Sequence, residues 1–177
     1  MYYIHVEDGQ INGAGMAQII NDNYENIEVS KEIYDDFRAD RDKYIYKDGE
    51  IVLNPEYDNI LLQRAKELKL EENVAERDKV LFGGVTYQNI LFDSDTDQKI
   101  NLSEQHKRMS DTDTVLWHGM NNESLLCTKD DLAAIGELIY GLTGFVWNKD
   151  AYIKDQIQVA ETLEDLANIE IDYNYGE

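Results

Sequence analysis

The chain has 177 residues, enough for one ordinary domain or two small ones, and its 42% hydrophobic and 10% aromatic content excludes a wholly disordered protein. Its 37 acidic and 16 basic residues give a formal net charge of −21, which disfavours direct nucleic-acid binding because an acidic surface repels phosphate. No apolar run of roughly eighteen residues and no secretory signal is visible, so we expect neither a membrane span nor export.

The first fifty-odd residues predict short strands joined by tight turns. Tyr2–Val6 alternates as a strand does and is followed by Asp8-Gly9, a dipeptide typical of hairpin turns. Asp48-Gly49 predicts a second hairpin, between strands at 44–46 and 51–53. Glu28–Val29 predicts another strand, and Ser30 is placed as the N-cap of a short helix.

Asn54-Pro55 predicts the start of a helix, because Asn is a good N-cap and Pro suits the first helical position. Apolar residues then recur at helical spacing until about Arg77, namely Tyr57, Leu61, Ala65 and Leu68. The repeat does not persist for three heptads, so we expect a connecting helix and no independent coiled coil.

Gly83-Gly84 ends that helical pattern. The β-branched and aromatic run Val85–Phe92 predicts a strand, which could pair with 79–82 across the glycines. A helix is expected over Thr96–Met109, and residues 115–118 and 124–127 flank a turn and predict another hairpin.

Thr128 opens the clearest helix of the chain, with a capping arrangement in which its hydroxyl bonds the amide of Asp131. One stripe of this helix is apolar: Leu132, Ile135, Ile139, Leu142, Val146 and Ile153. Three glycines (136, 141 and 144) interrupt it at roughly 1 kcal/mol each, which indicates either close packing or a bend. Thr162–Asp165 repeats the capping pattern, and Ile169–Tyr173 could end the chain as a strand or fray.

One acidic segment resembles a calcium-binding loop in its spacing. Asp93, Asp95, Asp97 and Glu104 occupy the first, third, fifth and twelfth positions of such a loop. Gln98 stands where that loop needs Gly, and a strand precedes the segment where a helix should. We therefore favour an acidic turn whose side chains cap the next helix, and whether these carboxylates ever bind a cation stays open.

No constellation of catalytic or cofactor-binding residues emerges from the remaining residues, and we expect no enzyme, no cofactor and no metal site. The three histidines (5, 106 and 118) lack metal-ligand spacing; His118 could line a pocket beside Trp117, but a hairpin position with a bonded ring nitrogen is favoured. Cys127, the only cysteine, is expected to be a small buried apolar residue. The twelve tyrosines could form a recognition surface, although half-buried sheet positions are favoured.

The C-terminal half resembles a domain of unknown function found in bacteriophage tail-fibre-associated proteins. The likeness covers roughly Val80–Tyr173 and rests on three segments: FGGVTYQNILFDSDTDQKINL, TVLWHGMNNESLLCTKDDLAAIG and AETLEDLANIEIDY. The positions that carry it are Phe92, Asp93, Ser94, Asp95, Trp117, Asn122, Leu126, Thr128 and Leu132. The N-terminal segments MYYIHVEDGQI and YIYKDGEIVLNPEY are similar, more weakly, to segments of small tail proteins.

This resemblance implies a role in the tail fibre or baseplate, or in its assembly, with no catalytic residues. The expected partners are other tail proteins, with a homo-oligomer possible and neither nucleic acid nor membrane, in the virion tail after assembly in the host cytoplasm. Two alternatives stay open: a transient fibre-assembly chaperone, and an acidic inhibitor of a host DNA-binding or defence protein. We expect an α+β protein with a β-hairpin-rich module (1–54), a connecting helix (55–79) and a C-terminal module of hairpins and helices (80–177).

Overall fold

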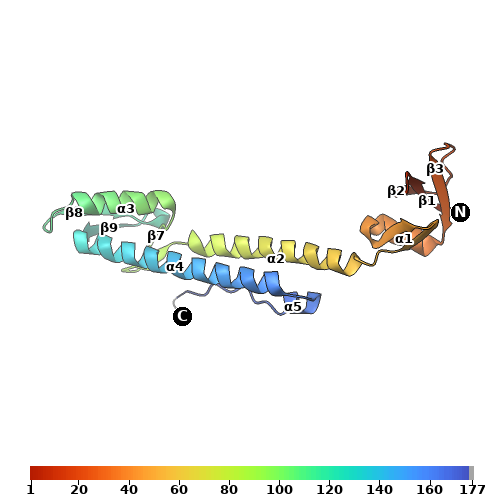
Figure 1. Ribbon diagram of the computed structural model, residues 1–177. Coiled ribbons are helices and arrows are strands. Elements are labelled where there is room, and N and C mark those ends of the chain that lie inside the picture. The colour runs from red at the N-terminus through yellow and green to blue at the C-terminus, as the bar shows by residue number, and fades with distance from the viewer. Residues whose placement is uncertain (176–177) are drawn as a thin grey trace. The chain divides into compact units, whose positions relative to one another are not determined.

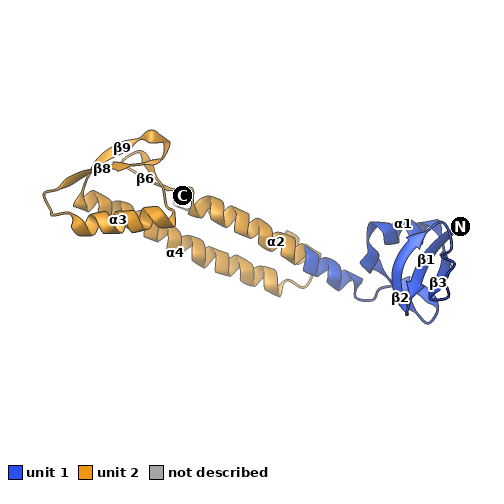
Figure 2. Cartoon of the chain, turned by 90° about the horizontal axis from the view of Figure 1, so that it is seen from above, with its two compact units in different colours: residues 1–64 blue, residues 65–177 orange. Residues whose placement is uncertain are grey.

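The computed structural model describes residues 1–175, which form helices and small antiparallel sheets, so the expected α+β class is confirmed (Figure 1). The chain divides into two compact units, residues 1–64 and 65–177 (Figure 2). The division falls inside helix α2 (Tyr57–Leu81). Within the described residues, no helix is both long and apolar enough to cross a membrane.

The first unit is built on a three-stranded antiparallel sheet of order β2-β1-β3, formed by β1 (Tyr2–Glu7), β2 (Gln10–Gly15) and β3 (Tyr24–Val29). The predicted turn at Asp8-Gly9 joins β1 to β2, and both residues have the positive φ that such a turn requires (51° and 76°). β1 is the central strand, and Ile4 and Val6 are almost wholly buried. The strand predicted at Glu28–Val29 is the end of the longer strand β3.

Helix α1 (Lys31–Ala39) begins where the sequence predicts, because the Ser30 hydroxyl accepts a hydrogen bond from the Ile33 amide at 3.2 Å. It buries Tyr34 and Phe37 beside β1. A 3₁₀ turn, η1 (Arg41–Lys43), leads to the second predicted hairpin, β4 (Tyr44–Lys47) and β5 (Glu50–Leu53).

Helix α2 begins two residues later and ends four residues later than the sequence indicates. Asn54 does not cap it; its side chain accepts from the Glu56 amide at 3.0 Å, closing a local turn before Tyr57. The predicted apolar stripe is also interrupted, since Leu68 is 66% exposed. The buried residues of α2 are instead Asn73 and Leu81.

The second unit is organised around α4 (Lys129–Val159), whose predicted apolar stripe is buried along its whole length. The α2 segment of this unit lies antiparallel beside α4 (Figure 1), since Lys66 contacts Gln158 at one end and Arg77 contacts Trp147 further along. The capping box at Thr128 and Asp131 is confirmed in both directions. It satisfies amides that the first turn of α4 would otherwise leave unpaired.

Two hairpins complete the framework, and the first corrects a prediction. Residues 85–92 are not one strand but two, β6 (Val85–Tyr87) and β7 (Ile90–Phe92), while residues 79–81 are the end of α2. Gln88 and Asn89 form the turn with φ of 49° and 65°. A Gln-Asn pair is not the usual signal for a two-residue turn, so the run appears continuous in sequence.

The second hairpin and the helix before it follow the predicted pattern. Helix α3 (Thr96–Arg108) precedes β8 (Thr114–His118), the 3₁₀ turn η2 (Met120–Asn122) and β9 (Ser124–Thr128). α3 packs against α4 at Gly136, where an added Cβ would lie 3.2 Å from the Leu102 side chain. Close packing therefore explains this glycine.

After the short helix α5 (Leu163–Ala167), the chain neither forms the strand nor frays. Ile169 and Tyr173 are buried although residues 169–175 belong to no helix or strand. The Tyr175 hydroxyl would lie 2.6 Å from a Cβ added at Gly141, so this segment covers α4 closely. Docking against α4, without ladder hydrogen bonds, holds the segment in place.

Candidate functional site

The acidic segment is a strand-to-helix junction. The Asp95 side chain accepts from the Gln98 amide at 2.7 Å as the N-cap of α3, and Asp93 accepts from the Asp95 amide at 2.9 Å. The capping interpretation is thus confirmed. Ser94, fully buried between them, donates to the Leu81 carbonyl at 2.6 Å and accepts from the Gly84 amide. It ties the junction to the end of α2, a role that the sequence pattern does not indicate.

The same carboxylates are not gathered around a common point. Glu104 binds Lys107 at 3.0 Å and Arg108 at 3.8 Å, and these cations lower the pKa of its carboxyl group. Within residues 1–175, no group of three or more His, Cys, Asp or Glu side chains is placed to hold a metal ion.

The single cysteine and two of the histidines are buried or hydrogen-bonded within the fold, as residues with a structural role are. Cys127 is fully buried, and burial raises the pKa of its thiol to about 11. His118 shares a hydrogen bond of 2.8 Å with the Ser124 hydroxyl across the hairpin, as expected of a hairpin residue with a bonded ring nitrogen. His5 makes a similar bond to Asn26 at 2.9 Å.

Most tyrosines occupy half-buried positions, and several donate to carboxylates. Nine of the twelve are buried or half-buried. Tyr24 donates to Glu7 at 2.9 Å and Tyr87 to Asp131 at 2.7 Å, and the bonded carboxylate raises the pKa of each phenol. These contacts use tyrosines to hold acidic side chains in place, which supports the structural interpretation.

A buried polar cluster joins α2, α4 and the C-terminal segment, and the sequence reasoning missed it. Asp150 is 3% exposed and accepts from the Asn73 amide at 2.8 Å and from Lys154 at 2.7 Å. The Tyr173 hydroxyl donates to the side-chain carbonyl oxygen of Asn73 at 2.7 Å. Burial, and to a lesser extent the negative charge of Asp150, raises the pKa of the Tyr173 phenol to about 12. Asp150 lies at the helical spacing of the apolar stripe, the one signal that could have placed it in the interior.

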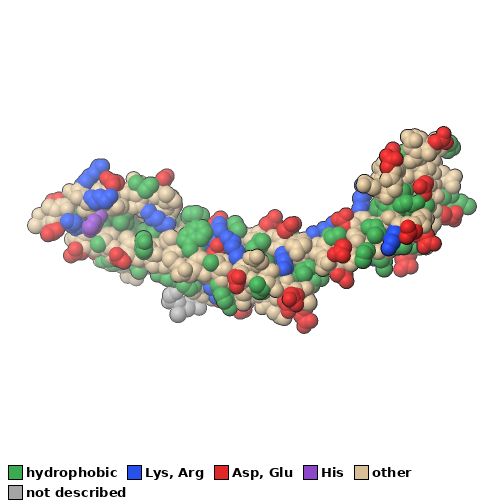
Figure 3. Space-filling model, viewed as in Figure 1, with side chains coloured by type: hydrophobic (Ala, Val, Ile, Leu, Met, Phe, Trp, Pro, Cys, Tyr) green, Lys and Arg blue, Asp and Glu red, His purple; other side chains and the backbone are tan. Residues whose placement is uncertain are grey.

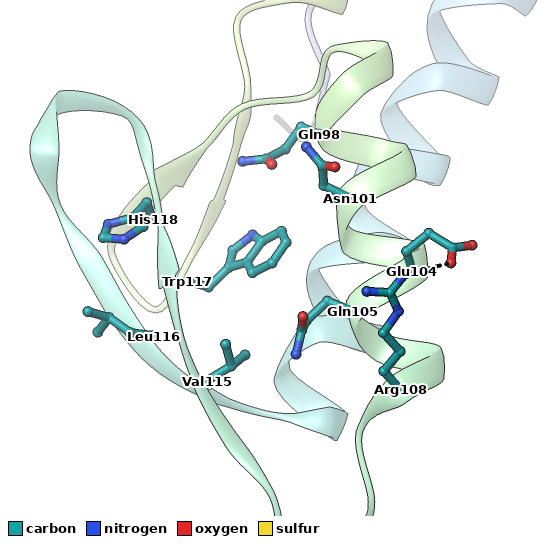
Figure 4. A pocket seen from close by; sticks show the side chains of 9 residues that line it. All are labelled: Gln98, Asn101, Glu104, Gln105, Arg108, Val115, Leu116, Trp117 and His118. Atoms are coloured by element: carbon teal, nitrogen blue, oxygen red, sulfur yellow. Dashed lines mark ion pairs between the residues drawn. The ribbon is translucent and has the colours of Figure 1, made fainter.

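The candidate site is a groove of about 490 Å³ between α3 and β8. Figure 4 shows the two elements side by side, with Gln98 near the His118 end and Arg108 near the Val115 end. Helix α3 contributes Gln98, Asn101, Glu104, Gln105 and Arg108, and the strand contributes Val115, Leu116, Trp117 and His118.

The helical wall of this groove is rich in amides. Gln98, Asn101 and Gln105 follow one another at i, i+3 and i+7, so they share one face of α3. Each amide both donates and accepts hydrogen bonds, and Trp117 adds a large aromatic surface. The groove can therefore hold a neutral polar chain by hydrogen bonds and stacking.

Sequence reasoning found part of this groove. It named Trp117 and His118 as a possible pocket, which the structure confirms while also giving His118 its hairpin hydrogen bond. It considered Gln98 and Glu104 only as parts of a calcium loop, and it missed Gln105 and Arg108. Their shared face on α3 was the available signal.

A second, apolar groove of about 340 Å³ lies between α3 and α4. Leu102, Gly136 and Ile139 contribute to its lining, and Tyr140 stands beside them 81% exposed. Trp147, two turns further along α4, is 48% exposed beneath the Arg77 guanidinium. Exposed aromatic groups next to a groove are typical of protein contact surfaces.

Comparisons with protein-family models, curated proteins and solved structures gave no match to the chain.

Proposed function

We propose that this chain is a structural or assembly protein of a bacteriophage tail and acts by binding other fibre or baseplate subunits. The setting rests on the resemblance of residues 80–173 to tail-fibre-associated proteins. The mode of action rests on the groove between α3 and β8, whose lining offers hydrogen bonds and stacking to a neutral polar partner. The apolar groove beside Tyr140 gives a further surface for protein contact.

A different tail protein is favoured over a second copy of the chain as the partner. Each copy carries a net charge of −21, so two copies repel one another at long range. A partner with less negative charge does not meet this repulsion. A homo-oligomer would have to be stabilised by extensive apolar contact, and its presence can be checked by analytical ultracentrifugation at low and high salt.

The acidic-inhibitor alternative requires carboxylates on one face at spacings like those of phosphates. Figure 3 shows Asp and Glu scattered among basic, hydrophobic and other side chains on the face that it displays. Several acids are also occupied, such as Asp131 with Tyr87 and Glu104 with Lys107. On the face displayed, this scatter does not give the one-sided row of carboxylates that mimicry of a nucleic acid requires.

The test is the protein content of purified virions from a phage that encodes this chain. Mass spectrometry that finds the chain in fixed stoichiometry with tail proteins identifies a structural component. Absence from virions, together with fibreless particles when the gene is deleted, identifies a transient assembly chaperone. Absence from virions together with normal, infectious particles after deletion contradicts both forms of the proposal.

A further inference from the structure

We propose that the free edge of β8 binds an extended segment of a partner protein as an added strand, held between β8 and α3. This inference rests on the proposed function, because it specifies how a partner subunit is held. Its occupant is a short extended segment of another protein, neutral along most of its length, with a carboxylate at the end beside Arg108.

The unpaired edge follows from the hairpin ladder. β9 is the only strand partner of β8 within residues 1–175. The Gly119 amide donates to the Glu123 carbonyl at 3.0 Å. Every second residue of an antiparallel strand bonds the partner strand, so the backbone groups of residues 117 and 115 also bond β9. The backbone groups of residues 114, 116 and 118 then point away from β9. Thr128, which lies opposite residue 114, agrees with this pattern: its amide donates to the Asp131 side chain and so does not bond β8.

The groove reaches this edge. Four consecutive residues of β8, from Val115 to His118, line it (Figure 4). Side chains of consecutive strand residues point to opposite faces, so no single face of the strand could supply all four. Figure 4 shows the Val115 and Trp117 side chains projecting toward α3, and the Leu116 and His118 side chains projecting away from it. Leu116 and His118 therefore meet the groove near their backbone, which brings the groove to the edge that carries the outward N–H and C=O groups of Leu116.

The opposite wall suits the outer side of such a strand. An added strand would bond β8 with one row of backbone groups and leave its other row facing α3. Gln98, Asn101 and Gln105 lie along that wall, and each carries both a donor and an acceptor, as a peptide group does. These amides would pair with backbone groups that no second strand covers.

Two further features select the occupant. The Trp117 indole N–H is buried and, among the side chains described here, is the one buried polar group without a hydrogen-bond partner. A carbonyl of the added segment would satisfy it once the indole turns toward the groove, because this nitrogen is closed to water in the free chain. At the other end, Lys107 and Arg108 both lie against the single carboxylate of Glu104, which leaves one positive charge in excess. In a chain of net charge −21, this local excess favours an acidic side chain of the partner.

A matched pair of variants tests the backbone contact. Leu116→Pro removes an outward N–H without breaking a β8–β9 hydrogen bond, and Leu116→Ala removes the same side chain but keeps the N–H. The probe is a yeast-displayed library of linear peptides about ten residues long, selected on the full-length wild-type protein. Circular dichroism and thermal melting establish that both variants fold.

Strand addition predicts that selected peptides bind wild type and Leu116→Ala alike, and bind Leu116→Pro about tenfold more weakly. It also predicts slower hydrogen exchange at the Leu116 and His118 amides when peptide is bound, and enrichment of Asp or Glu at one end of the peptides. Should Leu116→Pro fail to fold, peptides N-methylated at alternate residues are titrated onto wild type. One of the two methylation patterns then has to weaken binding about tenfold.

The inference is overturned if no peptide is enriched on wild type, if Leu116→Pro binds as wild type does, or if both methylation patterns are tolerated. These results leave the virion experiment untouched, since a tail protein could contact its partner by another surface. Conversely, a chain that proves irrelevant to tails could still bind peptides at β8, so the two failures are distinguishable.

Discussion

Replacing Asp150 with Ala tests how much the buried polar cluster stabilises the second unit. The change removes the acceptor of the Asn73 amide and of Lys154, and it leaves the Asn73 N–H buried without a partner. A buried orphan donor together with a lost charge-assisted bond lowers the free energy of unfolding by about 3 kcal/mol. Lys154→Ala is the matched control: the Lys154 side chain is 41% exposed, and Asp150 keeps the Arg77 guanidinium at 3.8 Å and the Asn73 amide, so the cost should be about 1 kcal/mol or less.

Urea unfolding followed by tryptophan fluorescence measures this cost in the right place. Both tryptophans of the chain, Trp117 and Trp147, lie in the second unit, so the signal reports that unit. A double-mutant cycle combines Asp150→Ala with Asn73→Ala. The double variant should lose at least about 1 kcal/mol less unfolding free energy than the two single variants together, because removing both side chains leaves neither of them buried without its partner. A cost for Asp150→Ala below about 1 kcal/mol, or no larger than that of Lys154→Ala, refutes the reasoning.

Three further outcomes are expected. The Cys127 thiol, buried and with a pKa raised to about 11, stays protonated at neutral pH and should resist iodoacetamide in the native protein; rapid alkylation would contradict this. Thr128→Ala should lower the free energy of unfolding by about 1 kcal/mol, measured by urea titration, because it removes the hydroxyl of the α4 capping box; an unchanged midpoint would count against the cap. In urea unfolding followed by circular dichroism, which reports both units, Gly84→Ala should cost more than Gly9→Ala. Both glycines have positive φ, but only at Gly84 would the Cβ meet backbone, 2.5 Å from the Phe92 carbonyl; equal costs would contradict the crowding.

Local signals in the sequence determined the elements that depend on nearby residues. The Asp-Gly turns, the Ser30 cap and the Thr128 box are where they were predicted, because a turn or cap needs only groups a few residues apart. The buried stripe of α4 was predicted for a similar reason: the helical period alone brings its residues to one face. The same local logic failed at residues 85–92, where a Gln-Asn turn lacks the usual signature.

The α3–β8 groove depends instead on how a helix packs relative to the strand that follows it, and only the tertiary structure could reveal that. Acidic side chains whose spacing resembles a calcium loop are separated into a helix cap and an ion pair. Amides with no recognisable motif line a groove beside a strand edge. Asp150 and Asn73 meet in the interior for the same reason. Spacing along the chain determined which residues share a helix face. The packing of α2, α3 and the β8–β9 hairpin around α4 decided what each face meets.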